Sequence, residues 1–597
     1  MTAQADGCIP FPLKHDESFD DLIDELTVVR NAMVAAPPSA KTWLDAVHPS
    51  FRASATNLLH YLAFRRHDLR QLQSKLAMRG LSSLGRAEAH VLGTVTQVLQ
   101  LLQQASSKQP VASDDEQPLG FLDSQRLLKE HTEMLFGPAI SGRDVRIMVT
   151  MPGEAADDHT LIHNLLEQGM NCMRINCAHD DKSVWLKMID HLKMAEKSLK
   201  RSCQIVMDLP GPKLRTGPME PGAAVVRVRP KRDAYGRVIS PARLWLTVSP
   251  AITPPPSPAD GALPVEKAWL EKLRPGETIA FSDVRGTKRA MTVADITPEG
   301  CWVELTRSAY IVPGTELCCV QGKNSKKRKT RVGPLPAREN YIFLRRGDTL
   351  VLTRDIKPGR SATFDSAGKL LTPASISCTL PDIFNDVRAG ESIYFDDGKI
   401  GGIIEKVTTA QLTIRITHSH VMGSKLGADK GINLPDSHLH LSALTAQDLD
   451  VLPFVVKYAD VVEFSFANCA EDVALLQKSM ASLKRKPPAI VLKIETKRAF
   501  KNLPAMLLTA MRAPCCGVMI ARGDLAVECG FERLAEVQEE ILWICEAAHI
   551  PVIWATQVLE TLAKSGMPSR AEITDAAMGH RAECVMLNKG PYIIEAI

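Results

Sequence analysis

The sequence predicts an α/β protein built on a (β/α)8 barrel (TIM barrel), with an inserted all-β domain after strand three and an N-terminal α-helical domain. Eight short apolar runs of β type alternate with amphipathic helical stretches. The runs are apolar throughout, as strands covered on both faces are. The rhythm stops for a long stretch between the third and fourth runs. A twisted open sheet is the structural alternative that this pattern leaves open.

The N-terminal part predicts helices. Residues 16–105 carry apolar side chains at helical spacing, as in SFDDLIDELTVVRNAMV, and SQRLLKEHTEMLF adds a further helix. Residues 106–120 are polar and contain proline, which is typical of a linker. We therefore expect residues 1–120 to form a helical domain with its linker.

The apolar runs place the barrel in two parts of the chain. We expect its first part at residues 121–212 and its second part at residues 431–597. The expected strands are residues 146–151, 170–176, 203–209, 459–466, 489–495, 517–524, 551–557 and 584–590.

The stretch between the two parts, residues 213–430, predicts an inserted β-barrel domain. It is rich in Pro, Gly, Val and Thr and contains a weak internal repeat. Each copy reads apolar-Arg-x-Gly-acid-Ser/Thr and is followed by a β-type run, which is typical of a turn that feeds a strand. The three copies are LRPGETIAFSD (273–283), LRRGDTLVLTR (344–354) and VRAGESIYFDD (387–397).

Composition narrows the class of protein. The 597 residues carry a net charge of only +4, so total charge gives no argument for a nucleic-acid or membrane partner. The 14 cysteines contain no Cys-x-x-Cys pair, and several lie in apolar runs, as buried thiols do in a reducing compartment. The acidic start lacks the pattern of a signal or transit peptide, and no apolar run reaches 18 residues. We expect a cytoplasmic protein without a membrane anchor.

The basic run at 323–331 is more typical of a solvated hairpin tip than of a nucleic-acid site.

Charged and polar residues gather at the ends of the expected strands. In such barrels, the carboxyl ends of the strands meet at one mouth, where the chemistry takes place. Structural ion pairs are the other explanation for charges at these positions. The residues concerned are Arg174, Asn176, Asp208, Lys493, Glu495, Arg522, Asp524, Thr556 and Gln557.

The residue types point to phosphate and metal chemistry. Two carboxylates without a His or Cys partner suit a hard cation such as Mg²⁺, which takes few protein ligands plus substrate oxygens. Arginine and lysine beside that cation suit a phosphate whose charge is neutralised during transfer. Gly523 and Asp524 precede a helical stretch and offer free backbone N–H groups to an anion. The sequence therefore predicts metal-assisted phosphoryl or carboxylate chemistry in a barrel.

These motifs resemble the pyruvate kinase family. IARGDLAVE (520–528) is similar to that family's metal-ligand stretch, and VLKIET (491–496) to its catalytic lysine and second metal carboxylate. VIWATQVLE (552–560) is similar to its signature after strand seven, and MDLPGPKLRTG (207–217) to its entry into the inserted domain. The similar motifs span residues 146–597 in the family's order, with a domain inserted at the same place.

The resemblance implies roles for individual residues. Glu495 and Asp524 would bind Mg²⁺ or Mn²⁺, and the Gly523–Asp524 amides would hold the substrate carboxylate. Lys493 would stabilise the phosphoryl group during transfer, and Arg174 would hold the phosphate. Thr556 would lie near the carbon that is protonated to give pyruvate.

The resemblance also implies the reaction and the nucleotide side. We expect Mg²⁺-dependent phosphoryl transfer from phosphoenolpyruvate to ADP, which gives pyruvate and ATP as in glycolysis. His179, Asp397 and Arg215 would lie near the nucleotide. A homo-oligomer through the barrel domain is expected.

The monovalent-cation region departs from the family pattern. Serine and threonine oxygens that normally help to hold K⁺ are replaced by Ala178 and Leu209, and a glutamate is replaced by Lys213. A lysine ammonium can put a fixed positive charge near the same place. We therefore expect Lys213, close to Asn176 and Asp208, to replace the monovalent cation, so that K⁺ is not required.

Other departures keep two alternative functions open. Pro210 replaces a lysine, and Asn588-Lys589-Gly590 replaces Ser-Gly-Glu, which alters the nucleotide side. The sequence stops at Ile597, inside the expected eighth helix, so we expect it to lack the family's C-terminal domain. The alternatives are another Mg²⁺-dependent enolate-forming barrel acting on phosphoenolpyruvate or a 2-oxo acid, and a catalytically weak regulatory protein that binds phosphoenolpyruvate.

Overall fold

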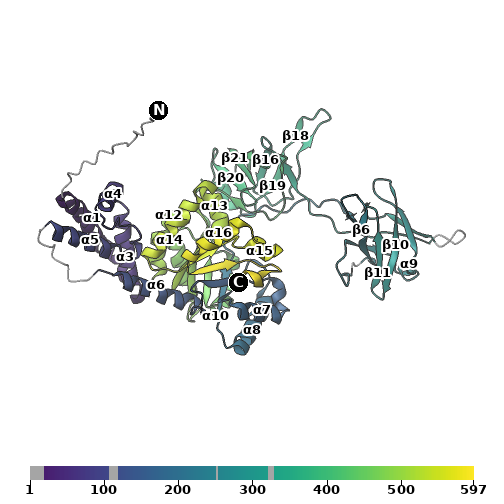
Figure 1. Cartoon of the computed structure of the whole chain (residues 1–597). Coiled ribbons are helices and arrows are strands. Elements are labelled where there is room, and N and C mark those ends of the chain that lie inside the picture. The colour runs from purple at the N-terminus through teal and green to yellow at the C-terminus, as the bar shows by residue number, and fades with distance from the viewer. Residues whose placement is uncertain (1–18, 107–117, 251–252, 321–327) are drawn as a thin grey trace, which may run out of the picture. The chain divides into compact units, whose positions relative to one another are not determined.

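The computed structural model describes residues 19–106, 118–250, 253–320 and 328–597 (Figure 1). They form two compact units. The first runs to Leu214 and also contains residues 382–407 and 431–597. The second contains residues 215–381 and 408–430.

Eight parallel strands close into a barrel in the first unit, which confirms the predicted fold class. The chain of the insertion leaves after the third strand and returns before the fourth. Around the barrel the strands are β1 (Arg146–Thr150), β2 (Cys172–Asn176), β3 (Gln204–Leu209), β25 (Val461–Phe464), β26 (Ala489–Ile494), β27 (Cys516–Ala521), β28 (Val552–Ala555) and β29 (Cys584–Leu587).

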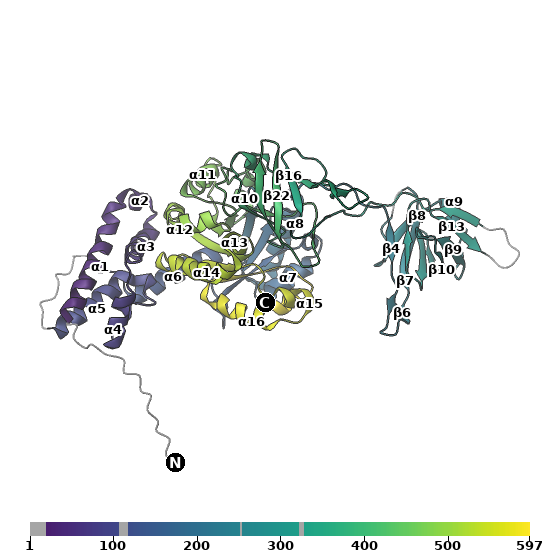
Figure 2. The same ribbon diagram turned by 90° about the horizontal axis from the view of Figure 1, so that it is seen from above.

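Helices follow the barrel strands, and several of them surround it in Figure 2. They are α7 (His159–Gln168), α8 (Lys182–Leu199), α10 (Ala446–Tyr458), α11 (Ala470–Ala481), α12 (Lys497–Ala510), α13 (Arg522–Cys529), α14 (Leu534–Ala547), α15 (Glu560–Ser565), α16 (Arg570–Met578) and α17 (Ile593–Ala596). Residues 522–524, expected at the end of strand six, instead open α13.

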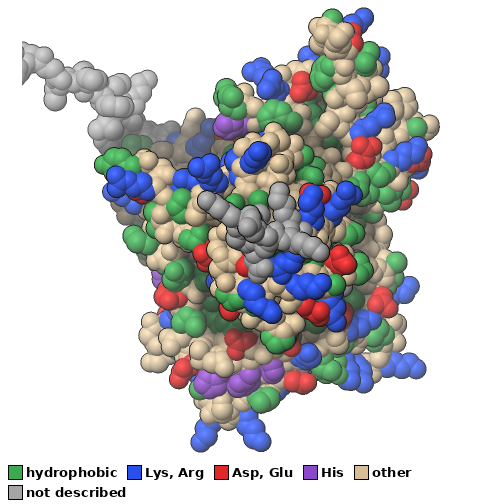
Figure 3. All heavy atoms as spheres, turned by 90° about the vertical axis from the view of Figure 1, so that its right-hand side faces the viewer, with side chains coloured by type: hydrophobic (Ala, Val, Ile, Leu, Met, Phe, Trp, Pro, Cys, Tyr) green, Lys and Arg blue, Asp and Glu red, His purple; other side chains and the backbone are tan. Residues whose placement is uncertain are grey.

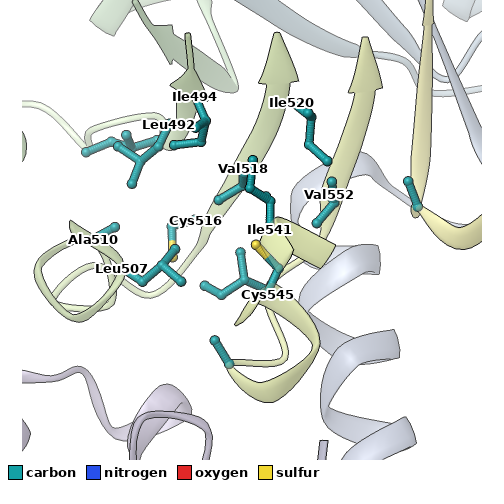
Figure 4. Packing of buried hydrophobic residues seen from close by; sticks show 14 of the residues in the cluster. Leu492, Ile494, Leu507, Ala510, Cys516, Val518, Ile520, Ile541, Cys545 and Val552 are labelled. Carbon is teal, nitrogen blue, oxygen red and sulfur yellow. The ribbon is translucent and has the colours of Figure 1, made fainter. Parts of the chain in front are cut away.

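The main core lies between the strands and these helices. Strand residues such as Leu492, Val518 and Ile520 face outward and pack against Leu507 of α12 and Ile541 of α14 (Figure 4). All five side chains are fully buried. Each strand contributes every second residue to this layer, so the other residues of the strand point into the barrel.

The N-terminal helices confirm the predicted helical segment. The linker expected at 106–120 lies mostly outside the described residues. The helices are α1 (Phe19–Ser39), α2 (Lys41–Ala46), α3 (Arg52–Phe64), α4 (Arg70–Met78), α5 (Val91–Ala105) and α6 (Phe121–Phe136).

The N-terminal helices contact the barrel through buried hydrogen bonds. The Asn57 amide donates to the carbonyl of Ala547 at 2.8 Å. The ring of His549, just before β28, contacts Ser54 Oγ at 3.0 Å and the carbonyl of Ala89 at 2.8 Å. Helix α6 ends with Leu135 and Phe136, which pack against inward-facing residues of the barrel. These helices therefore cover the end of the barrel at which the strands begin.

The second unit is all β apart from one short helix, α9 (Lys267–Leu270). Its largest sheet has seven strands in the order β14-β13-β9-β10-β11-β7-β8. They are β14 (Arg328–Arg331), β13 (Glu316–Val320), β9 (Thr278–Ser282), β10 (Lys288–Thr297), β11 (Gly300–Leu305), β7 (Ala242–Val248) and β8 (Gly261–Val265).

Shorter strands complete the β structure. In the second unit, β16 pairs with β19 and β22, β4 with β12, β15 with β23, β5 with β6 and β17 with β18. Their bounds are β4 (Val226–Val228), β5 (Lys231–Arg232), β6 (Val238–Ser240), β12 (Ala309–Ile311), β15 (Ile342–Leu344), β16 (Thr349–Thr353), β17 (Thr363–Phe364), β18 (Leu370–Thr372), β19 (Ala374–Ser377), β22 (Gln411–His418) and β23 (Ser424–Leu426). In the first unit, β20 (Ser392–Phe395) pairs with β21 (Ile400–Val407) and β24 (Ile432–Asn433).

The domain boundaries that we expect from the sequence stay a prediction.

The three sequence repeats fold as the same turn. In each copy the glycine adopts a positive φ, its N–H donates to a strand carbonyl at 2.8 Å, and the acidic side chain accepts from the N–H of the arginine. A strand begins two residues after each glycine. The glycines are Gly276, Gly347 and Gly390, with φ of 84°, 93° and 94°. Glycine is required there because other residues rarely adopt this conformation.

Lys and Arg side chains lie interspersed with Asp and Glu on the face seen in Figure 3. Part of the basic run at 323–331 lies outside the described residues. In its described part, Arg328 pairs with Glu277 at 2.5 Å and Lys329 with Glu316 at 2.8 Å. Mixed charges of this kind are typical of a solvated surface.

Two further features concern the whole described chain. No helix in it has the length and apolar character needed to cross a membrane. Its 13 cysteines are free thiols, and none of them is exposed. Burial raises the pKa of the Cys203, Cys516 and Cys545 thiols well above the ordinary value.

Candidate active site

Inward-facing residues form two layers inside the barrel. The first layer is apolar and comprises Met148, Cys172, Val206, Val461 and Val491. Two residues further along the same five strands, the second layer is polar and charged. It comprises Thr150, Arg174, Asp208, Glu463 and Lys493. Because side chains alternate along a strand, a step of two residues keeps them inside the barrel and moves toward its mouth.

Arg174 lies in the middle of the charged layer, and each of its three nitrogens has a partner. Its Nε donates to Glu463 Oε2 at 2.8 Å, and one terminal nitrogen donates to Thr150 Oγ1 at 2.9 Å. The other terminal nitrogen forms an ion pair with Asp208. The guanidinium is therefore fixed by residues from both neighbouring strands and from β25.

Asp208 and Lys493 form a second buried ion pair. Lys493 Nζ lies 3.2 Å from Asp208 Oδ1 and 2.7 Å from Ser465 Oγ. Burial opposes ionisation of Asp208, but Lys493 and Arg174 together hold its pKa below the ordinary value. Burial likewise opposes the charge on Lys493, yet the carboxylates of Asp208 and Glu495 raise its pKa. Both groups are therefore charged at neutral pH.

Glu495 and Asp524, the expected metal ligands, lie close enough to interact. Burial raises the pKa of Glu495, Lys493 lowers it, and the neighbouring Asp524 raises it. Lys493 Nζ lies 3.1 Å from Glu495 Oε1, and Lys213 Nζ lies 3.5 Å from Asp524 Oδ2. The backbone N–H of Phe466 donates to Glu495 Oε2 at 2.7 Å. Each carboxylate thus has one ammonium beside it.

The start of α13 is tied to the end of β28. The Gly523 N–H donates to Thr556 Oγ1 at 3.0 Å, so the two residues expected to touch the substrate are in contact. Arg522 donates to the carbonyls of Ala555 and Thr556 and pairs with Asp575. Thr556 has a φ of 67°, which is unusual for a β-branched residue and indicates local strain.

A cavity of about 100 Å³ lies beside Lys213 and Asp524. Its walls include the returning chain at 431–435 and polar side chains from the ends of two barrel strands, Asn468 and Thr496. One candidate metal ligand, Asp524, therefore borders a space that a small ligand can enter.

The monovalent-cation and nucleotide residues are only partly brought together. Asn176 lies at the end of β2, where its side chain accepts from the N–H of Ala178, and Asp208 pairs with Arg174 and Lys493. Lys213 pairs with Asp524. A β-carbon at Gly431 would lie 3.8 Å from Lys213 Cε and 3.9 Å from Asp397 Oδ1, so these two side chains lie near one residue.

His179 and Arg215 are the other expected nucleotide residues. His179 is exposed just after β2. Arg215 belongs to the second unit, where its guanidinium lies 3.2 Å from Asp429 Oδ1. His179 has no described contact with the charged layer.

Sequence reasoning missed three residues in or beside the charged layer: Thr150, Glu463 and Ser465. All three are buried and hydrogen-bond to Arg174, Asp208 or Lys493. Glu463 had a usable signal, because a carboxylate inside the apolar segment VVEF (461–464) needs a buried partner. Thr150 and Ser465 had none, since small hydroxyl residues are common at strand ends.

The residues present fit a hard divalent cation. Glu495 and Asp524 offer only oxygen atoms, and no group of three or more His, Cys, Asp or Glu able to hold a metal occurs in the described chain. A site with two carboxylates leaves most coordination positions to water and substrate oxygens, as Mg²⁺ sites commonly do.

Comparison with known proteins identifies the family. The sequence profile described as "Pyruvate kinase, barrel domain" matches residues 142–234 and 323–597, which is more than half of the chain. A pyruvate kinase of Thermococcus litoralis is 32% identical over 281 residues, which cover 45% of this chain and 53% of that protein. One of Rattus norvegicus is 30% identical over 338 residues, covering 55% and 54%.

A solved structure gives a similar match. A pyruvate kinase from Cryptosporidium parvum superposes with a TM-score of 0.49 at 20% identity, covering 78% of this chain and 70% of that one. The chain spans about half the length of the curated relatives that it matches. With the profile match over more than half of its residues, the chain belongs to the pyruvate kinase family.

Proposed function

We propose that this protein is a pyruvate kinase that transfers the phosphoryl group of phosphoenolpyruvate to ADP with Mg²⁺ and without K⁺. The observation that carries the proposal is the charged layer at the barrel mouth. There, Arg174 and Lys493 lie together, and Lys493 also touches Glu495, which neighbours Asp524. Cations and oxygen ligands side by side suit a transferred phosphoryl group.

The chain's own residues would act on substrate in three places. The terminal nitrogens of Arg174 would hold the phosphate, and the N–H groups of Gly523 and Asp524 would hold the carboxylate. Lys493 would neutralise charge on the phosphoryl group as it leaves the enol oxygen and joins a terminal oxygen of ADP. The enolate left behind then takes a proton on carbon, near Thr556, to give pyruvate.

Glu495 and Asp524 would hold the divalent cation. When bound, the cation would supply electrostatic stabilisation of phosphate and enolate oxygens. Lys213 and Lys493 lie within about 3.5 Å of these carboxylates, so Glu495 and Asp524 would each have an ammonium beside the cation that they would hold.

Lys213 would supply the charge of the missing monovalent cation. Its ammonium lies 3.5 Å from Asp524, and its Cε and Asp397 Oδ1 lie near the same residue, Gly431, which supports a fixed positive charge at the candidate nucleotide side. A lysine cannot dissociate as K⁺ does, so turnover would not depend on the salt present.

The test is pyruvate formation from phosphoenolpyruvate, ADP and Mg²⁺ in potassium or in tetramethylammonium salt. We expect equal rates in both salts, no turnover after metal removal by a chelator, and recovery with Mg²⁺ or Mn²⁺. Lys493→Ala should lose about 10²–10³-fold in turnover. Lys213→Glu should fail in both salts, and the exposed Lys187→Ala serves as the matched control.

Each alternative outcome has a distinct meaning. Turnover that requires K⁺ would keep the kinase and remove the role given to Lys213. Turnover of phosphoenolpyruvate without nucleotide would indicate the alternative enolate-forming enzyme. Binding of phosphoenolpyruvate by a folded protein without any turnover would indicate the regulatory protein.

A further inference from the structure

Glu463 is the least exposed charged residue of the barrel mouth. It lies on β25 opposite Asp208 of β3 and Val491 of β26, and its relative exposure is 0%. One oxygen, Oε2, accepts from Arg174 Nε at 2.8 Å. The other, Oε1, is buried and has no hydrogen-bond partner among the described residues. A buried carboxylate oxygen without a partner is costly and calls for an explanation.

The contact with Arg174 fixes the plane of the guanidinium. A guanidinium has five N–H groups, and Glu463, Thr150 and Asp208 accept one each. One hydrogen remains on each terminal nitrogen. Because Glu463 accepts from Nε, these two terminal N–H groups remain available to an anion.

Glu463 also changes the charge of the layer. Arg174 and Lys493 contribute two positive charges, whereas Asp208, Glu463 and Glu495 contribute three negative groups, all of them buried. Burial raises the pKa of Glu463 to about 7, although Arg174 lowers it. Asp208 pairs with both cations and Glu495 pairs with Lys493, so these two carboxylates already balance the two positive charges without Glu463.

We propose that Glu463 is a positioning residue that orients Arg174 and at the same time weakens the binding of anions to it. This inference rests on the proposed function in placing the substrate phosphate at Arg174. The negative charge of Glu463 repels a phosphate at Arg174, so the affinity for phosphate is low when no divalent cation is bound. Tight binding of phosphate therefore requires the divalent cation at Glu495 and Asp524.

The experiment measures the binding of inorganic phosphate and of phosphoenolpyruvate by calorimetry, without nucleotide, to wild type and to two variants. Glu463→Gln keeps an oxygen for Arg174 Nε and removes the charge, so we expect about fivefold tighter binding or more. Glu463→Ala removes both the oxygen and the charge. Its affinity for phosphate should fall below that of the glutamine variant, and its kcat should fall by a larger factor than its KM changes. Rescue of kcat by glutamine but not by alanine is the mark of positioning.

Glu583→Gln is the matched control. It removes another buried carboxylate, at the opposite end of the barrel next to β29, and should leave phosphate affinity unchanged. If Glu463→Gln does not fold, Glu463→Met provides a side chain of similar volume that lacks both the charge and the acceptor for Arg174 Nε, so its phosphate affinity and kcat should match those of Glu463→Ala.

Three results would overturn the inference. They are an affinity of Glu463→Gln within about twofold of wild type or weaker, equal kcat for the glutamine and alanine variants, and phosphate binding to Glu463→Ala as tight as to Glu463→Gln. Absence of turnover in a wild type that binds phosphate would refute the proposed kinase and leave the role of Glu463 toward anions standing, judged by the affinities alone.

Discussion

The two ends of the barrel differ in whether their buried ionisable groups have partners of opposite charge. At the mouth, Arg174, Asp208 and Lys493 are charged and paired with one another. At the end where the strands begin, burial lowers the pKa of His549 to about 4 and raises that of Glu583 to about 7, so burial disfavours the charged form of both groups. The mouth thus keeps these three residues charged by pairing them, whereas no such pairing offsets burial for His549 and Glu583 at the end where the N-terminal helices pack.

The difference follows from the available partners. Charges at the mouth come from neighbouring strands and meet at hydrogen-bond distance. His549 meets only a hydroxyl and a backbone carbonyl, and Glu583 meets the N–H of Val552. Buried charges persist only where opposite charges are close. The mouth is therefore the end at which buried charges are kept by pairing.

The largest effect should come from breaking the charged layer. Arg174→Met leaves Asp208 and Glu463 buried without their shared cation, and should reduce the free energy of unfolding by about 3–5 kcal/mol. Urea unfolding at pH 7 measures it. A loss below about 1 kcal/mol would mean that water already reaches this layer.

His549 should make the other end sensitive to acid. Its pKa is about 4 in the folded chain and near 6.5 when unfolded, so the unfolded state binds the proton more readily between these values. Stability should fall by about 2 kcal/mol from pH 7 to pH 5 through this residue. His131, whose pKa burial also lowers, contacts the carbonyl of His549 and adds to the fall. His549→Asn should flatten the profile of unfolding free energy against pH, and an unchanged slope would refute the assignment.

Glu583 should have the opposite pH dependence. Its pKa rises from the ordinary 4.5 to about 7 on folding, so its contribution is lost as pH rises through that range. Glu583→Gln keeps an acceptor for the N–H of Val552 and should stabilise the protein at pH 8 by about 1–2 kcal/mol, with no gain at pH 4. Paired thermal melts at the two pH values measure this. A gain of equal size at both would show that packing, not charge, is responsible.

The smallest effect should come from the apolar layer. Met148→Leu conserves side-chain volume in the apolar layer, two residues before Thr150 on β1. It should change the free energy of unfolding by less than about 1.5 kcal/mol. Turnover should be unaffected, which separates this layer from the charged one. A loss of activity without a loss of stability would show that the two layers are coupled.

The sequence predicted the barrel because its strands are local apolar runs, and it predicted Arg174, Asp208 and Lys493 because they end those runs. The repeated turns were equally accessible, since a glycine at positive φ and an acidic neighbour leave a local pattern. Each of these features can be recognised within a short segment, because its local pattern does not depend on the rest of the fold.

Long-range partners could not be predicted in the same way. Lys213 was expected near Asn176 and Asp208, but its ammonium pairs with Asp524, because a long side chain on a turn can reach several neighbours. The pairing of Glu463 with Arg174 joins residues from two strands separated in the sequence by the whole insertion. No local pattern specifies such a contact.

The shielded thiols have a practical consequence. Because ten of the described cysteines are buried and burial suppresses thiolate formation in several, alkylating reagents should reach these ten only when the structure opens. Cys172, Cys516 and Cys584 lie on three different barrel strands, and Cys301 lies in the large sheet of the second unit. The order in which the native cysteines are labelled during unfolding would therefore report the order in which these strands separate.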